Sequence, residues 1–305
     1  MIVLRGVQPP MRRAVFPLLL LALLAPAYDW PMKPFDQPHP VRGFFDDPRR
    51  DMDVEGGRQQ SFHSGIDISA PDETPVYAIE QGQASLRSSA VVVTGASRHV
   101  FGYWHIVPAV ESGTVVRRHQ LIGYVEPGRG HVHLSESVGA AYLNPLRPGA
   151  LAPFDDDTQP RITNVELSAG SGRVDLTAVR GAVDLVAGAY DTPPLSPPGL
   201  WAASRVTPAL VRWRILGLQG IVVPWRIAVD FRLSLLPRSL FNLVYAPGTR
   251  ENRAARPGDY RFYLARGFDT STLPPGLYHL QVWAADTRRN RAIALLPFTV
   301  ATQSR

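Results

Sequence analysis

The alternation of apolar and polar positions predicts short β-strands through most of this chain. Between residues 41 and 150, brief apolar runs are separated by glycine and proline, and β-branched residues are frequent within the runs. No stretch there keeps a helical period, so the pattern indicates a β domain. The runs cover residues 90–94, 100–107, 114–116, 121–125 and 131–135.

The same kind of pattern resumes at Arg161. In the run 278–283 (YHLQVW), Tyr278, Leu280 and Val282 alternate with the residues of the opposite face, which is typical of a half-buried strand. This spacing predicts an immunoglobulin-like β-sandwich over residues 161–302, while residues 235–244 fit either a helix or a strand. The strand-like runs of this half are 162–167, 173–178, 182–189, 260–264, 278–285 and 292–300.

We therefore predict an all-β chain, with an antiparallel β-sheet domain at 41–150 followed by the sandwich. Two segments of different composition flank the first domain. Residues 28–40 are rich in proline and aromatic side chains and are interpreted as an irregular lead-in. Residues 151–160 carry three consecutive aspartates between two prolines, which we interpret as a solvated linker rather than a calcium site.

The first 27 residues have the pattern of an export signal. Arg12 and Arg13 form a basic start, residues 14–24 form an apolar run, and Ala25 and Ala27 form a small-residue cleavage site. The apolar run is too short to cross a bilayer, which needs ~20 residues. We predict cleavage after Ala27 and a mature protein outside the cytoplasm, in the periplasm or secreted, with no membrane attachment.

Composition limits the metal ligands, the nucleophiles and the partners that the chain can have. The chain has no cysteine, which excludes disulfides, thiolate metal sites and a cysteine nucleophile, so any metal must be held by His, Asp or Glu. The formal charge is +6, and Lys33 is the only lysine. Basic residues do not cluster with aromatic ones, so a nucleic-acid partner is not predicted.

Two pairs of residues have spacings suited to a metal site. On a straight strand, His63 and Asp67 would lie ~13 Å apart, too far to share an ion. The chain must therefore bend between them, and Gly65 permits a bend. We expect His63 on a loop leading into a strand that carries Asp67, with Phe62, Ile66 and Ile68 packed beneath.

The second pair is His131 and His133. Residues two apart on a strand face the same side, ~6.6 Å apart, so both can point into one cleft while Val132 and Leu134 face the core. His105, beside Tyr103 and Trp104, is on spacing alone typical of a buried, hydrogen-bonded strand histidine.

Residues 41–148 resemble the lysostaphin/LytM-type zinc endopeptidases, with the motifs in the family's order. Segment 62–68 (FHSGIDI) matches H-x-G-x-D, and 131–134 (HVHL) matches H-L-H-F. Segment 74–78 (TPVYA) matches T-P-V-x-A, and 103–106 (YWHI) lies where the family has Y-x-H-L. The family's opening strand, its V-x-x-G-Q-x-I-G stretch and its closing N-P correspond to 41–49, 116–123 and 144–145.

The resemblance implies a zinc metalloendopeptidase domain that binds one Zn²⁺ per chain. It assigns His63, Asp67 and His133 as zinc ligands, and His105 and His131 as catalytic histidines beside the reacting water. The implied substrate is a peptide bond in a peptidoglycan stem or cross-link, and the family pattern leaves room for a regulatory protein partner.

The chain departs from this pattern in three places, the first of which is the harmless replacement of the usual leucine by Ile106. His119 stands where glycine is common, and we expect it on the surface. Residues 84–103 lack the glycine-rich G-Y-G-N element that lines the substrate groove, which puts the substrate preference in doubt.

Two alternatives to a wall peptidase remain open. One is a non-catalytic module that binds cell wall or activates another hydrolase, although such modules usually lose metal ligands. The other is a zinc peptidase that acts on secreted proteins. The sandwich tryptophans Trp201, Trp213, Trp225 and Trp283 could bind glycan, but core packing is the commoner role.

Overall fold

The computed structural model describes residues 27–52, 58–170 and 172–302. The predicted signal peptide therefore lies outside the described residues, apart from Ala27. Within the described part, no helix is long and apolar enough to span a membrane.

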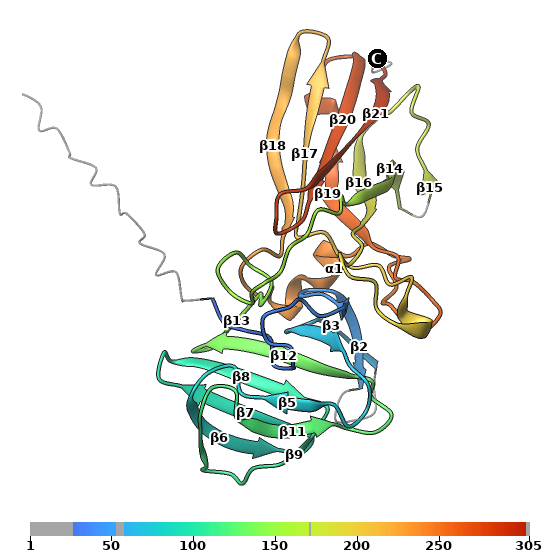
Figure 1. Cartoon of the computed structure of the whole chain (residues 1–305). Helices are drawn as coiled ribbons and strands as arrows, with labels where there is room; N and C mark the ends of the chain where they lie inside the picture. Colours follow the sequence, from blue (N-terminus) through green and yellow to red (C-terminus); the bar gives the residue numbers. More distant parts are fainter. Residues whose placement is uncertain (1–26, 53–57, 171, 303–305) are drawn as a thin grey trace, which may run out of the picture.

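Strands dominate both lobes of the molecule, which confirms the all-β prediction (Figure 1). Helical residues in the described ranges are confined to α1 (Phe241–Val244) and the 3-10 turns η1 (Gly199–Trp201), η2 (Arg238–Leu240) and η3 (Thr270–Thr272). Residues 235–244, left open by the sequence, thus contain η2 and α1.

The first lobe is built from antiparallel strands β1 to β13. The largest sheet has the order β1-β4-β12-β8-β7-β6-β10, with β13 beside β12; a second sheet is β5-β11-β9, and β2 pairs with β3. The strands are β1 (Val41–Gly43), β2 (Pro48–Met52), β3 (Arg58–Phe62), β4 (Ile66–Ser69), β5 (Pro75–Tyr77), β6 (Gly82–Arg87), β7 (Ala90–Gly95), β8 (His99–Trp104), β9 (Ile106–Pro108), β10 (Val115–Val116), β11 (Leu121–Val125), β12 (His131–Val138) and β13 (Ala141–Leu143).

Alternation along β12 determines which face of the main sheet carries the two histidines of this strand. Val132 and Leu134 are fully buried in the core of the first lobe, as predicted from the period of two. His131 and His133 therefore point to the opposite face.

The second lobe is a sandwich of two antiparallel four-stranded sheets, β15-β14-β16-β19 and β18-β17-β20-β21. Apart from the short β15, this order is that of an immunoglobulin-like fold. Trp213 is buried on β17, and the Tyr278 hydroxyl at the start of β20 donates to the Pro274 carbonyl at 2.7 Å, a tyrosine corner. The strands are β14 (Arg161–Ala169), β15 (Gly172–Arg173), β16 (Ala182–Tyr190), β17 (Leu210–Gly217), β18 (Gly220–Asp230), β19 (Arg261–Asp269), β20 (Gly276–Ala285) and β21 (Arg291–Val300).

Two details of this lobe differ from the sequence prediction. The predicted strand at 173–178 is reduced to β15, because the Asp175 carboxylate accepts from the Thr177 amide and closes a turn. The hairpin of β17 and β18 was not predicted. In β18, exposed apolar residues such as Ile221 and Ile227, together with Pro224, hide the alternation that would mark a strand.

The flanking segments are packed rather than solvated. Trp30 and Met32 of the lead-in are buried in the first core, and the Trp30 indole donates to the Pro153 carbonyl at 2.7 Å. In the predicted linker, Phe154 and Asp156 are buried, whereas Asp155 and Asp157 are exposed. The interpretation of a solvated linker is therefore wrong, because the aspartate run conceals one inward-facing carboxylate.

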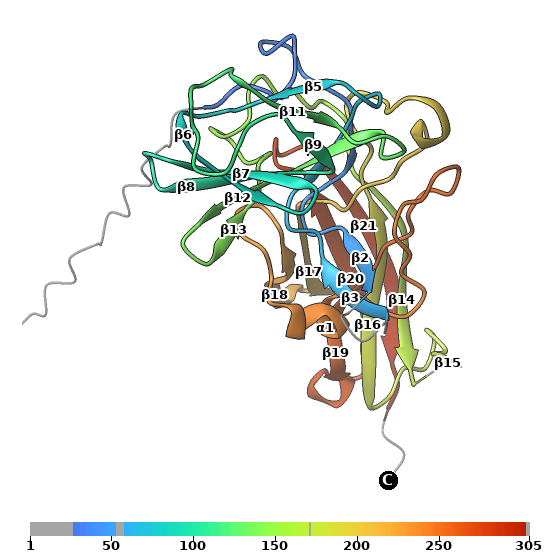
Figure 2. The same cartoon turned by 90° about the horizontal axis from the view of Figure 1, so that it is seen from below.

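The lobes share a polar and aromatic junction. The fully buried Asp47 accepts from the Thr207 amide at 2.8 Å and from its hydroxyl at 2.9 Å. Phe62 packs against Phe241 and Tyr245, and the hairpin that carries it lies beside α1 (Figures 1 and 2). Phe62 thus belongs to the second core, not beneath the site as expected; Ile66 and Ile68 do lie in the first core.

Candidate metal centre

Strand register brings two of the predicted ligands face to face. In the antiparallel pair β4–β12, Asp67 lies directly opposite His133, and the His133 Nδ1 atom is 3.1 Å from Asp67 Oδ1. His63 enters from the loop between β3 and β4; its Nε2 atom lies 3.1 Å from Asp67 Oδ1 and 2.8 Å from His133 Nδ1. Two imidazole nitrogens and one carboxylate oxygen therefore converge on a single point.

Gly65 makes the bend between His63 and Asp67 for a steric reason. A Cβ added at this position would collide with the Leu134 carbonyl and lie 2.9 Å from His133 Nε2. The loop can therefore approach β12 closely only if residue 65 has no side chain.

Backbone and arginine contacts orient the converging atoms. The His63 Nδ1–H donates to the Phe44 carbonyl at 2.7 Å, which leaves Nε2 with a free lone pair facing Asp67 and His133. The Arg49 guanidinium donates to Asp67 Oδ2 at 2.8 Å, so Oδ1 remains directed at the imidazoles. Outer contacts of this kind hold metal-binding side chains in position.

The electrostatics favour the protonation states that metal ligands need. Burial, followed by the charge of Arg49, lowers the pKa of His63 to about 3, so this imidazole is neutral at pH 7. Burial alone would raise the pKa of Asp67, but His63 and Arg49 together outweigh it and hold that pKa well below the usual range. A neutral imidazole and an ionised carboxylate are the forms that bind metals.

The three converging atoms can hold a metal ion. Tetrahedral zinc with ligand bonds of ~2.0–2.1 Å separates neighbouring ligand atoms by about 3.3 Å. The observed separations of 2.8–3.1 Å are close to this edge length, so a small outward movement of the side chains admits the ion. The donor set of nitrogen and oxygen also suits zinc.

The other two predicted histidines lie beside this centre. His131 Nε2 is 3.7 Å from Asp67 Oδ1, and the rings of His131 and His105 are 4.7 Å apart. His131 Nδ1 lies 2.6 Å from the Arg42 guanidinium and 2.8 Å from the Arg129 carbonyl. The ring is therefore held from behind while Nε2 faces the pocket.

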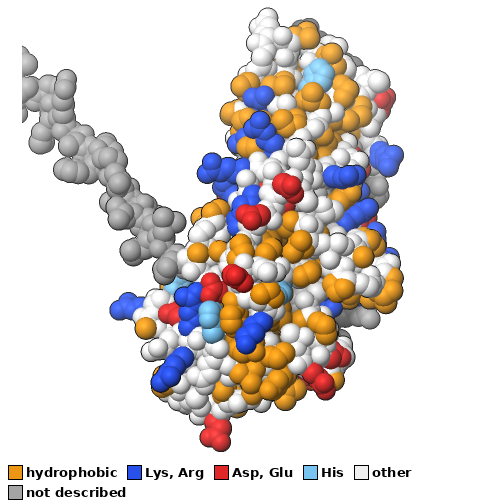
Figure 3. All heavy atoms as spheres, in the orientation of Figure 1, with side chains coloured by type: hydrophobic (Ala, Val, Ile, Leu, Met, Phe, Trp, Pro, Cys, Tyr) orange, Lys and Arg blue, Asp and Glu red, His pale blue; other side chains and the backbone are white. Residues whose placement is uncertain are grey.

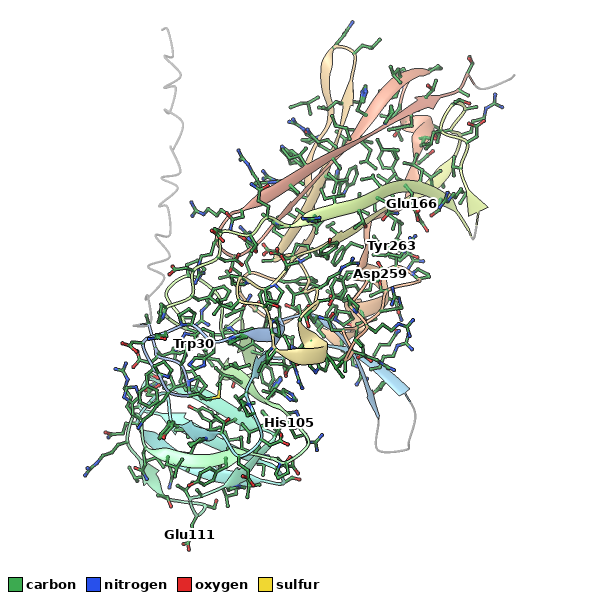
Figure 4. All side chains as sticks on the ribbon, turned by 45° about the vertical axis from the view of Figure 1, so that its right-hand side comes forward. Trp30, His105, Glu111, Glu166, Asp259 and Tyr263 are labelled. Carbon is green, nitrogen blue, oxygen red and sulfur yellow. The ribbon has the colours of Figure 1, made fainter. Side chains whose placement is uncertain are left out.

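His105 differs from the strand histidine suggested by its spacing. It separates β8 from β9 and has a left-handed backbone, with φ of 64°. Its Nδ1 atom is buried and has no hydrogen-bond partner among the described residues. Such a conformation is uncommon for a residue other than glycine. Figure 4 labels His105 on the first lobe.

Both flanking histidines are neutral at pH 7. Burial, followed by the neighbouring His131, lowers the pKa of His105 to about 4. Burial also lowers the pKa of His131, where Asp67 acts in the opposite direction and Arg42 adds to the lowering. Each ring therefore offers one N–H and one lone pair, so each can donate one proton and accept another.

A pocket of about 380 Å³ gathers all five predicted residues. Its wall also includes Arg49, Trp104 and Tyr142, to which sequence reasoning gave no role. Arg42 was likewise missed, because nothing in the sequence spacing of Arg42 or Arg49 indicates that either arginine contacts a site residue.

The structure also places two histidines outside the pocket. The His99 Nδ1 atom lies 2.6 Å from Glu136 Oε1, and His119 stacks on Phe35 and is half-buried rather than on the open surface.

Gly65→Ala tests the steric argument. The added methyl group must displace the Leu134 carbonyl or His133, so we expect the affinity for zinc to fall by about 10- to 100-fold. Equilibrium zinc titration against a chromogenic chelator measures this. Gly172→Ala is the matched control, because its Cβ would meet only the Ala169 carbonyl at 3.7 Å. Equal zinc affinity in both variants would contradict the close approach.

No known protein family and no curated protein matches this sequence. Among solved structures, the solution structure of lysostaphin is 14% identical, covering 88% of this chain and 90% of that one with a TM-score of 0.32. The M23 metalloprotease pseudoalterin is 15% identical over 49% of this chain and 86% of that one, with a TM-score of 0.28. A chain of the SpoIIQ-SpoIIIAH pore-forming complex is 23% identical over 35% of this chain and 80% of that one, also at 0.28.

Proposed function

We propose that this protein is an exported zinc metalloendopeptidase that hydrolyses peptide bonds in peptidoglycan. The observation that carries the proposal is the convergence of His63, Asp67 and His133, with two further neutral histidines on one side of the same pocket. A metal site flanked by proton-transfer groups is the arrangement that metal-assisted hydrolysis requires.

His63 Nε2, Asp67 Oδ1 and His133 Nδ1 would hold the zinc ion. Three protein ligands leave a fourth position open, which is the pattern of catalytic rather than structural zinc. When bound, zinc lowers the pKa of water towards ~7 and polarises a carbonyl oxygen.

His131 and His105 would divide the proton chemistry. Asp67 Oδ1 lies 3.7 Å from His131 Nε2 and favours a positive charge there, so His131 is the better proton acceptor. It takes the proton of the attacking water and delivers it to the leaving amine. His105, on the other side of His131, donates a hydrogen bond to the substrate carbonyl oxygen as negative charge develops on it.

The substrate class follows from the motif resemblance and the predicted export signal. The pocket is open to solvent and is bounded by Trp104 and Tyr142, which leaves room for an extended peptide. On the face shown in Figure 3, acidic, basic and apolar side chains are interspersed over both lobes.

The proposal is tested by measuring zinc content and peptidoglycan hydrolysis on one sample of purified protein. We expect about one zinc per chain, release of new amines from peptidoglycan, loss of both after chelation, and recovery when zinc is restored. Sequencing the released fragments identifies the bond that is cut.

The other outcomes separate the alternatives. A protein that binds zinc and cleaves secreted proteins, but does not hydrolyse peptidoglycan, would be a peptidase with a protein substrate instead of a cell-wall substrate. A protein that binds peptidoglycan but holds no zinc would instead be a regulatory module, and the proposal would fail.

A further inference from the structure

Three aspartates from distant parts of the chain meet at the junction of the lobes. Asp156 comes from the segment between the lobes, Asp191 follows β16, and Asp286 begins the turn between β20 and β21. Each offers a carboxylate oxygen, and these oxygens lie within 4.8 Å of one another. All three residues are buried, with exposed fractions of 9%, 1% and 4%.

The hydrogen bonds of this cluster leave buried oxygens unused. Asp156 Oδ1 accepts from the Thr158 amide and hydroxyl, and Asp191 Oδ1 accepts from the Thr192 amide. The Oδ2 atoms of Asp156 and Asp191 are both buried and have no partner among the described residues. A buried carboxylate oxygen without a partner is costly, since it has lost water and gained nothing in return.

The neighbouring cation does not neutralise the cluster by direct contact. The Arg288 guanidinium donates to the carbonyls of Phe154 and Leu146 at 2.9 and 3.0 Å, not to the three carboxylates. Burial, and next the charge of Asp156, raises the pKa of Asp191 to about 8, and burial also raises the pKa of Asp156 and Asp286. The charge of Arg288 lowers the pKa of Asp156 without a direct contact, and burial still outweighs it, so ionised carboxylates at these positions are only partly compensated.

We propose that Asp156, Asp191 and Asp286 bind a calcium ion at the junction of the two lobes. The available donors are all oxygens, which favours a hard cation over zinc. Calcium accepts six to eight oxygen ligands in flexible geometry, including backbone carbonyls, whereas magnesium demands a near-ideal octahedron and retains several waters. A buried site of irregular loops suits calcium better.

Such an ion would stabilise the junction between the two lobes by linking segments from each side of it. One ligand precedes the sandwich, while the other two lie on segments that leave its two different sheets, β16 and β20. The same turn also reaches the first lobe, because Arg288 donates to the Leu146 carbonyl. Calcium would thus hold the sandwich against the first lobe, at a site separate from the histidine centre.

The test is calcium titration of the purified full-length protein by calorimetry, together with thermal unfolding with and without calcium chloride. We expect one calcium per chain, and a rise in Tm on the order of 5 °C at a calcium concentration 100 times the Kd. Asp191→Asn should weaken calcium binding by at least about 10-fold and abolish the rise in Tm, since it removes a charged ligand from the site. Asp156→Asn provides a second test if the first variant does not fold.

Asp157→Asn is the matched control, because Asp157 is the exposed neighbour of Asp156 and should leave the calcium response unchanged. Failure of the wild type to bind calcium at millimolar concentration would overturn the proposal. An Asp191→Asn variant that binds calcium like the wild type would overturn it equally. Neither readout depends on peptidase activity, so the result is independent of the proposed function.

Discussion

His133→Ala is expected to lose both the zinc ion and all hydrolysis. The change removes one of three converging ligand atoms, and leaves His63 Nε2 and Asp67 Oδ1 as the remaining two. Loss of a contact that merely orients a metal ligand costs about 10- to 100-fold in affinity, so loss of a ligand itself should exceed about 100-fold. Metal analysis after dialysis against buffered zinc, paired with an amine-release assay, measures both effects.

His279→Ala is the matched control for this experiment. His279 lies on β20 of the sandwich, far along the chain from the pocket, and should keep full zinc and full activity. The thermal stability of His133→Ala must be measured alongside, so that metal loss is separated from unfolding. A folded His133→Ala protein that retains one zinc per chain would show that the ligand assignment is wrong.

The positions of most site residues could be predicted because they follow from local chain geometry. A period of two places His131 and His133 on one face of β12, and buries Val132 and Leu134 on the other. The requirement that His63 and Asp67 share a site predicted the bend between them, although Gly65 is needed for a close approach rather than for an unusual φ.

Other features of the site depend on contacts that no local pattern encodes. Arg49 reaches Asp67 from the hairpin β2–β3, and Arg42 reaches His131 from β1, across large separations in sequence. The left-handed conformation of His105 interrupts what looked like one strand at 100–107. The buried aspartate cluster was hidden for the same reason, because its members lie in three separate loops.

The second lobe helps to position the candidate metal centre rather than simply following it in the chain. Phe62, which precedes His63, is held in the aromatic core of the sandwich, and Asp47 is bonded to Thr207. The Phe44 carbonyl, which orients His63, belongs to the same turn as Asp47, and the Phe44 amide donates to Asp47 Oδ2 at 2.8 Å. The position of His63 therefore depends on a junction that spans both lobes.

His131→Ala is expected to keep its zinc and lose catalysis. The His131 side chain contacts Arg42 and the Arg129 carbonyl, but its Nε2 atom stands 3.7 Å from Asp67 outside the three converging ligand atoms. Removing the proton acceptor should lower kcat by about 10²- to 10⁴-fold, while zinc content stays near one per chain. Single-turnover hydrolysis of a defined peptide and metal analysis on the same preparation give the two numbers.

His105→Ala is the informative comparison, because this residue should also keep zinc but acts only through a hydrogen bond to the substrate. Removal of one such donor costs about 10²- to 10³-fold in kcat, so its loss should be no greater than that of His131→Ala. A much larger loss in His105→Ala would exchange the two roles, with His105 as the proton acceptor. His131 and His133 lie on the same face of β12, but it is His133 that reaches Asp67 and His63. If His131→Ala lost its zinc while His133→Ala kept it, His131 would be the zinc ligand and His133 the catalytic histidine.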